Sequence, residues 1–202
     1  KGKRIATATG TTAHVFLDKA LRANKVDPKE VELLNQSMPA AVTAFISGAV
    51  PAVALWVPFN VTVRDKVPGA VKLADASAYY PQAAIIGGWA ARNDYYDGNR
   101  ETLSKLVRGW AEANDYITAN SAEAMESLQK KHYSQTPLSD INEQFKAQKM
   151  FTSKDWKRMY SDETVTNWLQ QSTDFFMANA NIKDFTPAKT YFDPSLYLKA
   201  LA

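Results

Sequence analysis

The sequence predicts an α/β protein in which a doubly wound parallel sheet is followed by a helix-rich segment. Over about the first 80 residues, short apolar runs alternate with stretches of helical periodicity in the order β-α-β-α-β. Parallel strands joined by right-handed crossovers produce this alternation. After residue 98, apolar residues recur almost entirely at helical spacing. The chain therefore has two parts of different texture.

The first part is predicted from its apolar runs and the helices between them. Strands are expected at residues 4–9, 31–35 and 52–56, the first of them ended by Gly10. The intervening helices are indicated by one shared face and by a proline suited to a first turn. The face comprises Ala13, Phe16, Leu17, Ala20, Leu21 and Asn24, and the second helix begins near Pro39.

The second part begins with two predicted strands, at residues 70–73 and 83–91, and then turns helical. A long helix is indicated by an apolar stripe from Leu103 to Ile117. Further helices are expected at 122–131, 138–148, 153–160, from a cap at Ser161 or Asp162 to Phe176, and at 196–201 after a coil. Core packing is expected for Trp89, Trp110, Trp156 and Trp168.

Composition narrows the function classes. The chain has no cysteine and two histidines, which argues against disulfides, thiolate metal sites and zinc or iron centres. Its net charge of +3 is scattered, without the basic stripe of a nucleic-acid partner. No phosphate loop, dinucleotide fingerprint or nucleophile elbow is present. The sequence thus predicts a protein that is not an enzyme and needs no cofactor or metal.

The strongest local motif is Thr9-Gly10-Thr11-Thr12-Ala13-His14, between the first strand and the first helix. Unpaired N–H groups and the helix dipole attract anions at such a position. It also lies at the carboxyl end of a parallel strand, where open α/β sheets bind ligands. The hydroxyls of Thr11 and Thr12 either cap the helix or donate to an oxyanion, and both alternatives remain open here.

Other residues join this motif as candidates. Gln36 follows the second strand, and Trp56 ends the third, at the same edge of the sheet. Trp56 either walls a pocket or packs in the core. The candidate ligand-binding residues are Thr9, Gly10, Thr11, Thr12, His14, Gln36 and Trp56.

The ordered series of motifs resembles one family, the nitrate/sulfonate/taurine group of ABC-transporter solute-binding proteins. The similarity begins with Lys1-Gly2-Lys3-Arg4-Ile5-Ala6 and Gly10-Thr11-Thr12-Ala13-His14. It continues through Val31-Glu32-Leu33-Leu34-Asn35, residues 41–54, Leu55-Trp56-Val57-Pro58-Phe59 and Tyr191-Phe192-Asp193-Pro194. The resemblance therefore extends over nearly the whole chain.

This resemblance implies a type II periplasmic-binding-protein-like fold, with a small anionic solute held between two lobes. It implies that hydroxyls and N–H groups at Gly10, Thr11 and Thr12 hold the anion head group. Sulfonates, taurine and nitrate are the solute classes implied, and the membrane permease of an ABC importer is the implied partner. The implied location is the periplasm, or a lipid-anchored extracytoplasmic position in a Gram-positive cell. Val57 departs from the family's acidic residue before the proline, so a carboxylate to hold a ligand amine is lacking.

The resemblance also implies an organisation into lobes. Residues 1–82 would form the complete second lobe, and residues 83–202 the helix-rich return part of an incomplete first lobe, making the chain a carboxy-terminal fragment. An incomplete cleft and exposed apolar helix faces are then expected, and with them self-association of the fragment.

Two other functions share this fold class. A ligand-sensing domain of a transcription regulator would normally follow a helix-turn-helix, and would not show the pattern from Leu55 to Phe59. A thiamine-pyrimidine synthase-like enzyme would carry a cysteine-rich iron motif, which this cysteine-free sequence does not have.

Overall fold

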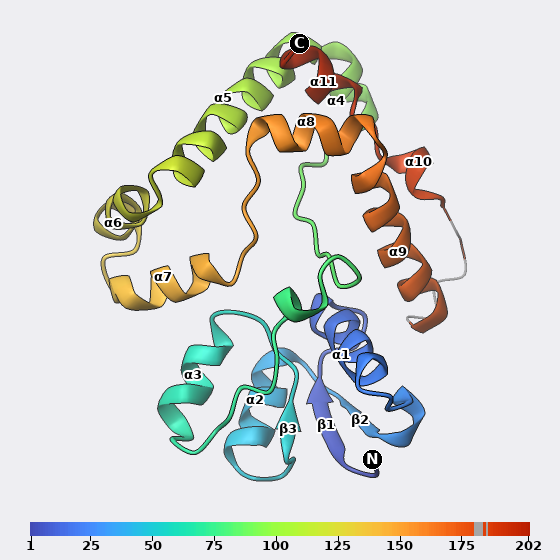
Figure 1. The fold of residues 1–202 in the computed structure, drawn as a ribbon, viewed down its shortest axis with the longest axis vertical. Helices are drawn as coiled ribbons and strands as arrows, with labels where there is room; N and C mark the ends of the chain where they lie inside the picture. The colour runs from blue at the N-terminus through green and yellow to red at the C-terminus, as the bar shows by residue number, and fades with distance from the viewer. Residues whose placement is uncertain (180–183, 185) are drawn as a thin grey trace. The chain divides into compact units, whose positions relative to one another are not determined.

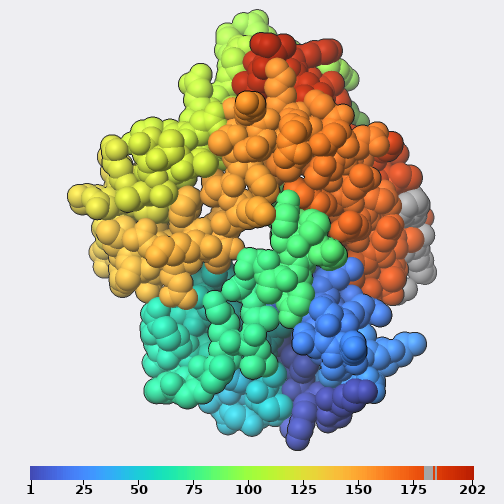
Figure 2. All heavy atoms as spheres, in the orientation of Figure 1, coloured from blue at the N-terminus to red at the C-terminus, as the bar shows by residue number. Residues whose placement is uncertain are grey.

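A computed structural model describes residues 1–179, 184 and 186–202 of the chain (Figure 1). The chain forms two compact units. Unit 1 comprises Lys1–Ile85 and Asp174–Phe185, and unit 2 comprises Ile86–Thr173 and Thr186–Ala202. The colours of Figure 2 follow the chain through both units in the same orientation. The chain re-enters unit 1 at Asp174, whereas the prediction divided it only once, after residue 82.

Unit 1 is built on a parallel sheet of three strands in the order β2-β1-β3, which confirms the predicted α/β fold. Its elements are β1 (Arg4–Thr7), α1 (Thr12–Ala23), the 3-10 helix η1 (Pro28–Glu30), β2 (Glu32–Asn35), α2 (Met38–Ile46), β3 (Ala52–Val53), α3 (Phe59–Lys66) and the 3-10 helix η2 (Ala76–Tyr79). Ile5 of β1 lies between Leu33 of β2 and Ala52 of β3.

The strand order creates a switch point beside β1. The chain leaves β1 for β2 on one side and then crosses to β3 on the other. Ligands of open α/β sheets bind at the carboxyl ends of strands where the order reverses in this way. The buried Thr7 hydroxyl donates to the carbonyl of Ala54 at 2.9 Å, and the Ala54 N–H donates to the carbonyl of Ala6 at 3.0 Å. These bonds fix the loop after β3 beside the loop after β1.

Helix α2 joins the two apolar clusters of unit 1. Ala41 packs with Ala6 of β1 and Val50, while Met38 and Val42 pack with Ala13 of α1 and Val63 of α3. The sequence did not predict α3, because its β-branched residues have low helix propensity. Phe59 and Val63 lie one helical turn apart and both pack on the second cluster, so burial of this face outweighs propensity.

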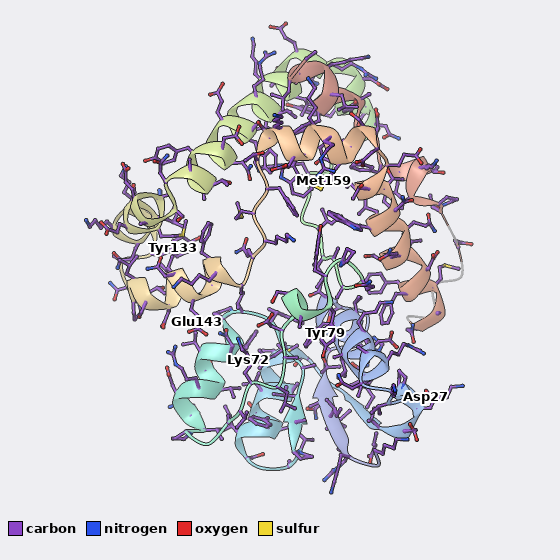
Figure 3. All side chains as sticks on the ribbon, viewed as in Figure 1. Asp27, Lys72, Tyr79, Tyr133, Glu143 and Met159 are labelled. Atoms are coloured by element: carbon purple, nitrogen blue, oxygen red, sulfur yellow. The ribbon has the colours of Figure 1, made fainter. Side chains whose placement is uncertain are left out.

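The 3-10 helix η2 attaches the end of this segment to α1. The ring of Tyr79 lies 6.0 Å from that of Phe16, and its hydroxyl accepts a hydrogen bond from Asn24 at 3.3 Å. Figure 3 labels Tyr79 at this place. These two contacts hold η2 against α1 and the residue that follows it.

Unit 2 is helical, as predicted. Its helices are α4 (Asn93–Gly98), α5 (Arg100–Ala119), α6 (Ser121–His132), α7 (Leu138–Lys146), α8 (Ser153–Ser161), the first part of α9 (Thr164–Asn179), α10 (Ala188–Tyr191) and α11 (Ser195–Ala200). The short α10 lies in the segment expected to be coil. No helix in the described ranges is long and apolar enough to cross a membrane.

Aromatic side chains join three helices of unit 2. Tyr197 of α11 contacts Tyr160 of α8 and Trp110 of α5, with ring centroids 4.7 Å and 6.2 Å apart. Met159 and Trp168 are buried, with exposed fractions of 2% and 6%. The burial of Trp168 confirms its expected core position, whereas Trp110 is half-buried and contacts this core through Tyr197. Figure 3 labels the buried Met159 on α8.

Three predictions for residues 70–91 are wrong. The segments 70–73 and 83–91 form no strand, and Trp89 is 74% exposed rather than in the core. A strand needs a neighbour for its ladder of hydrogen bonds, and no described strand pairs with either segment. Val71 and Leu73 are accordingly 77% and 88% exposed.

Candidate functional site

The candidate site is the turn between β1 and α1. Gly10 has a φ of +71°, a left-handed conformation that glycine adopts without strain. Thr11 follows as the N-cap residue, with an extended backbone. Its hydroxyl donates to the carbonyl of Ala8 at 2.6 Å and makes no hydrogen bond to the first turn of α1. The Thr11 hydroxyl therefore fills neither of the two roles open to it, because its single proton is donated to Ala8 and it does not cap the helix.

The uncapped helix start leaves three backbone donors free. The N–H groups of His14 and Val15 donate to the Thr11 carbonyl at 3.0 Å and 3.2 Å. Those of Thr11, Thr12 and Ala13 find no acceptor among residues 1–179, 184 and 186–202. The exposed Thr12 hydroxyl has no partner there either. Because the helix dipole places positive potential at these donors, the turn can bind an oxyanion.

Side chains from both flanking elements hold the turn in place. The Thr9 N–H donates to Oδ1 of Asn35, at the end of β2, at 3.0 Å. The Gly10 N–H donates to Nδ1 of His14 at 3.3 Å. Asn35 was not among the predicted site residues, although a polar residue at the carboxyl end of the second strand was a signal that could have found it.

Gln36 lies next to this turn through its backbone. Its N–H donates to the carbonyl of Thr7, the last residue of β1, at 3.0 Å. Its side-chain oxygen Oε1 is buried and accepts no hydrogen bond from the described part of the chain. A buried oxygen of this kind has an unmet need for a donor. The structure thus brings Gln36 to the same sheet edge as Thr9 and Gly10.

His14 is held by an aromatic contact that sequence reasoning missed. Its half-buried ring meets the buried ring of Phe175 edge to face, with centroids 5.0 Å apart. Burial lowers the pKa of His14, and the carboxylate of Asp18 partly offsets that shift. A neutral imidazole is also what the Gly10 hydrogen bond to Nδ1 requires. No local pattern could have paired Phe175 with a residue so distant in sequence.

Trp56 packs against the apolar core, one of the two roles predicted for it. Its half-buried ring packs on the apolar cluster that contains Ala13, and it lies 6.2 Å from the ring of Phe59. It therefore supports the first turn of α1 from the apolar side. A cavity bordered by His14 and Asp18 measures only about 30 Å³, room for no more than a water molecule. No cluster of metal-ligating side chains occurs in the part of the chain that the structure describes.

The neutral state of His14 makes stability depend on pH. Because the folded-state pKa lies below the ordinary value, the unfolded chain binds this proton first as pH falls. The contribution of His14 is present above about pH 6.5 and is lost as pH falls through the folded-state pKa. We expect the urea midpoint to fall between about pH 8 and pH 5 by more in the parent chain than in His14→Gln.

A His132→Gln variant controls this measurement, because it removes an exposed imidazole at the end of α6. Equal pH dependence in the parent chain and in His14→Gln would contradict the assignment of a buried, neutral His14.

Comparisons with known proteins agree with this fold. The chain is 27% identical over 192 residues to a candidate binding protein of Brucella abortus, covering 95% of the chain and 60% of that protein. It is 27% identical over 108 residues to the taurine-binding periplasmic protein of Escherichia coli K12, covering 53% and 33%. The crystal structure of the periplasmic aliphatic sulphonate binding protein SsuA from Escherichia coli superposes with a TM-score of 0.71 at 19% identity, covering 96% and 59%.

The chain thus spans about 60% of the length of the first of these relatives. The family model described as "NMT1/THI5 like" matches residues 1–124, which include all of the sheet, the turn at Gly10 and the whole of the long helix α5. This match extends over more than half of the chain, and the chain therefore belongs to the NMT1/THI5-like family.

Proposed function

We infer that this chain is the solute-binding component of an ABC importer for a small anion that carries an oxyanion head group. It works outside the cytoplasm, in the periplasm or lipid-anchored to a Gram-positive cell, and passes its solute to a membrane permease. Its solute is a sulfonate such as taurine, or nitrate. The names of two relatives, for taurine and for aliphatic sulphonates, support this class of solute.

One observation carries this inference: the start of α1 is uncapped at the switch point of the sheet. Three N–H groups, at Thr11, Thr12 and Ala13, have no acceptor in the described chain. The oxygens of a sulfonate or nitrate would accept from them and from the Thr12 hydroxyl. Hydrogen bonds to a charged acceptor contribute about 1.5–3 kcal/mol each, so a small anion can be held without a cationic side chain.

The surroundings of the turn suit a head group with several oxygens. Asn35 and His14 occupy the N–H groups of Thr9 and Gly10, so these groups position the loop. The N–H groups that remain free are consecutive in the first turn of α1. They can therefore donate to neighbouring oxygens of one anion. Relatives named as binding proteins support a role in binding rather than in catalysis.

Val57 bears on the choice among sulfonates. It follows Trp56 in the loop after β3 and is 38% exposed. The resemblance places an acidic residue at this position, and a valine there offers no charge to a ligand amine. We therefore propose that ethanesulfonate binds more tightly than taurine, from which it differs only by lacking the amine.

The test is a thermal-shift screen of the chain against sulfonates, nitrate and carboxylates, with neutral and cationic solutes of matched size as controls. A solute that binds the folded state raises the melting temperature by mass action. We expect oxyanions alone to raise it, with ethanesulfonate acting at lower concentration than taurine. A shift produced by neutral or cationic solutes but by no oxyanion would overturn the proposal.

A further inference from the structure

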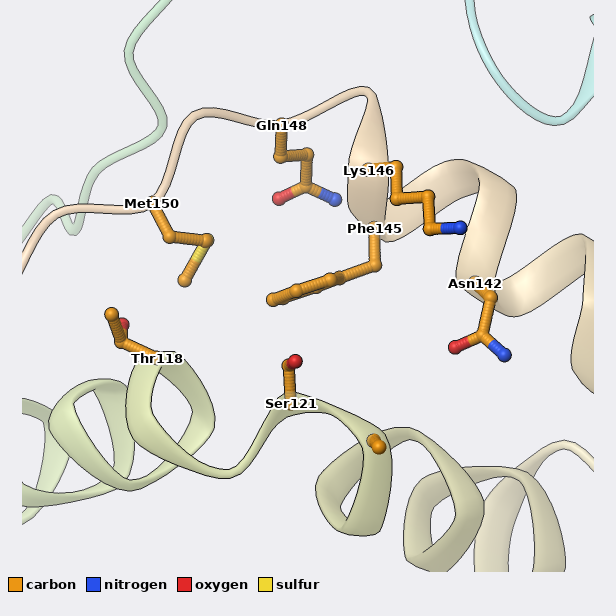
Figure 4. A pocket seen from close by; sticks show the side chains of 8 residues that line it. Thr118, Ser121, Asn142, Phe145, Lys146, Gln148 and Met150 are labelled. Atoms are coloured by element: carbon orange, nitrogen blue, oxygen red, sulfur yellow. The ribbon is translucent and has the colours of Figure 1, made fainter.

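A second cavity lies wholly within unit 2. It measures about 460 Å³ and is bordered by the end of α5, the start of α6, and α7 with the loop after it. Figure 4 shows the side chains of Thr118, Ser121, Phe145 and Met150 turned toward a common space. This volume lies in the range of pockets that hold small organic molecules.

Most of the polar side chains around this cavity have no partner among the described residues. Ser121, Asn142, Lys146 and Gln148 make no side-chain hydrogen bond or ion pair with any described residue. Thr118 donates to the carbonyl of Asn114 at 2.7 Å and keeps its lone pairs for an acceptor role. Amide, hydroxyl and ammonium groups therefore meet at one concave surface with their hydrogen-bonding capacity unused.

The apolar part of the cavity comes from Phe145 and Met150. Phe145 packs on the cluster formed by Ala124, Met125 and Ile141, which holds the base of its side chain. Figure 4 shows its ring projecting into the cavity between Gln148 and Ser121. A ring fixed in this way offers a surface on which a flat apolar group can stack.

The side chains that line the cavity carry a net positive charge. Lys146 is the single charged residue among the lining side chains of this described cavity, and no carboxylate accompanies it. Its ammonium makes no ion pair with a described residue, whereas Lys130 of α6 pairs with Glu126. An unpaired cation beside amide donors selects a negative group.

We propose that this cavity binds a small organic anion with a flat apolar body, such as an aromatic carboxylate. The ring of the ligand stacks on Phe145 beside Met150. Its carboxylate accepts from the ammonium of Lys146 and from the amides of Asn142 and Gln148. This site is separate from the turn at Gly10, because every residue that lines it belongs to unit 2.

The test is an NMR titration of the ¹⁵N-labelled chain with benzoate, compared with the neutral isostere benzamide. We expect benzoate to shift amide signals of residues 118–122 and 142–150, and benzamide to bind at least about tenfold more weakly. Equal affinities for the two ligands, or benzoate shifts confined to other residues, would overturn the proposal.

Matched variants distinguish the effect of the Lys146 charge from the effect of the net charge of the protein. Lys146→Gln should weaken benzoate binding about tenfold, whereas Lys131→Gln, which removes an exposed lysine at the end of α6, should leave it unchanged. Phe145→Leu keeps an apolar group on the underlying cluster and should also weaken binding. Equal losses in the two lysine variants would reduce the effect to net charge and contradict the site.

Discussion

Replacement of Thr12 by proline is expected to lower the affinity for a sulfonate at least about tenfold while leaving the melting temperature of the free chain unchanged. Thr12 is the first residue of α1, the helical position that proline tolerates best. Its N–H has no acceptor among the described residues, so no intramolecular hydrogen bond is lost. The extended backbone of Thr11 already suits a following proline. The measurement pairs isothermal titration with ethanesulfonate and thermal denaturation without it.

Two further threonine variants serve as comparisons. One isolates the contribution of the Thr12 hydroxyl, and the other is a control away from the turn. Thr12→Ala removes the hydroxyl and keeps the N–H, so its loss of affinity should be smaller. Thr43→Ala removes an exposed hydroxyl of α2 that donates to Pro39, and it should bind as the parent chain does. An unchanged affinity of Thr12→Pro for ethanesulfonate would contradict anion binding at this turn and leave it a purely structural role.

Replacement of Met159 by alanine is expected to reduce the free energy of unfolding of unit 2 by about 2–5 kcal/mol. The side chain is 2% exposed on α8, the helix whose Tyr160 contacts Tyr197 of α11. Removal of this buried side chain leaves a cavity that the surrounding structure closes only partly. Urea denaturation followed by circular dichroism measures the change.

Met150→Ala is the matched control, since that methionine is half-buried at the edge of the unit 2 cavity. It should cost about 1 kcal/mol or less. Unfolding of both variants at the same urea concentration would contradict the assignment of Met159 to the core of unit 2.

The elements that the sequence predicted well are those with local causes. The strand predicted at residues 4–9 is observed at 4–7, and Gly10 and the start of α1 follow it within a few residues. Each has its own signal, namely an apolar run, a glycine and a hydroxyl residue before helical periodicity. The candidate site was therefore located from these residues, although its uncapped state depends on which way the Thr11 hydroxyl turns.

The failures have non-local causes. Residues 70–73 and 83–91 have the composition of strands, but a strand exists only beside a partner, and the described chain supplies none. Conversely, α3 has poor helix propensity, and the packing of Phe59 and Val63 on a distant cluster decides its structure. The contact between Phe175 and His14 belongs to the same class, since nothing near either residue predicts it.

The uncapped start of α1 bears on how this protein can be engineered. A side-chain cap contributes about 1 kcal/mol to a helix, and Thr11 forgoes it by turning its hydroxyl to Ala8. Thr11→Asp would bring a carboxylate to the N–H groups of this turn, as stabilising helix designs do. The same carboxylate would occupy the donors proposed for the solute and repel its charge. Helix capping, ordinarily a safe way to stabilise a protein, would here raise thermal stability at the expense of the proposed anion binding.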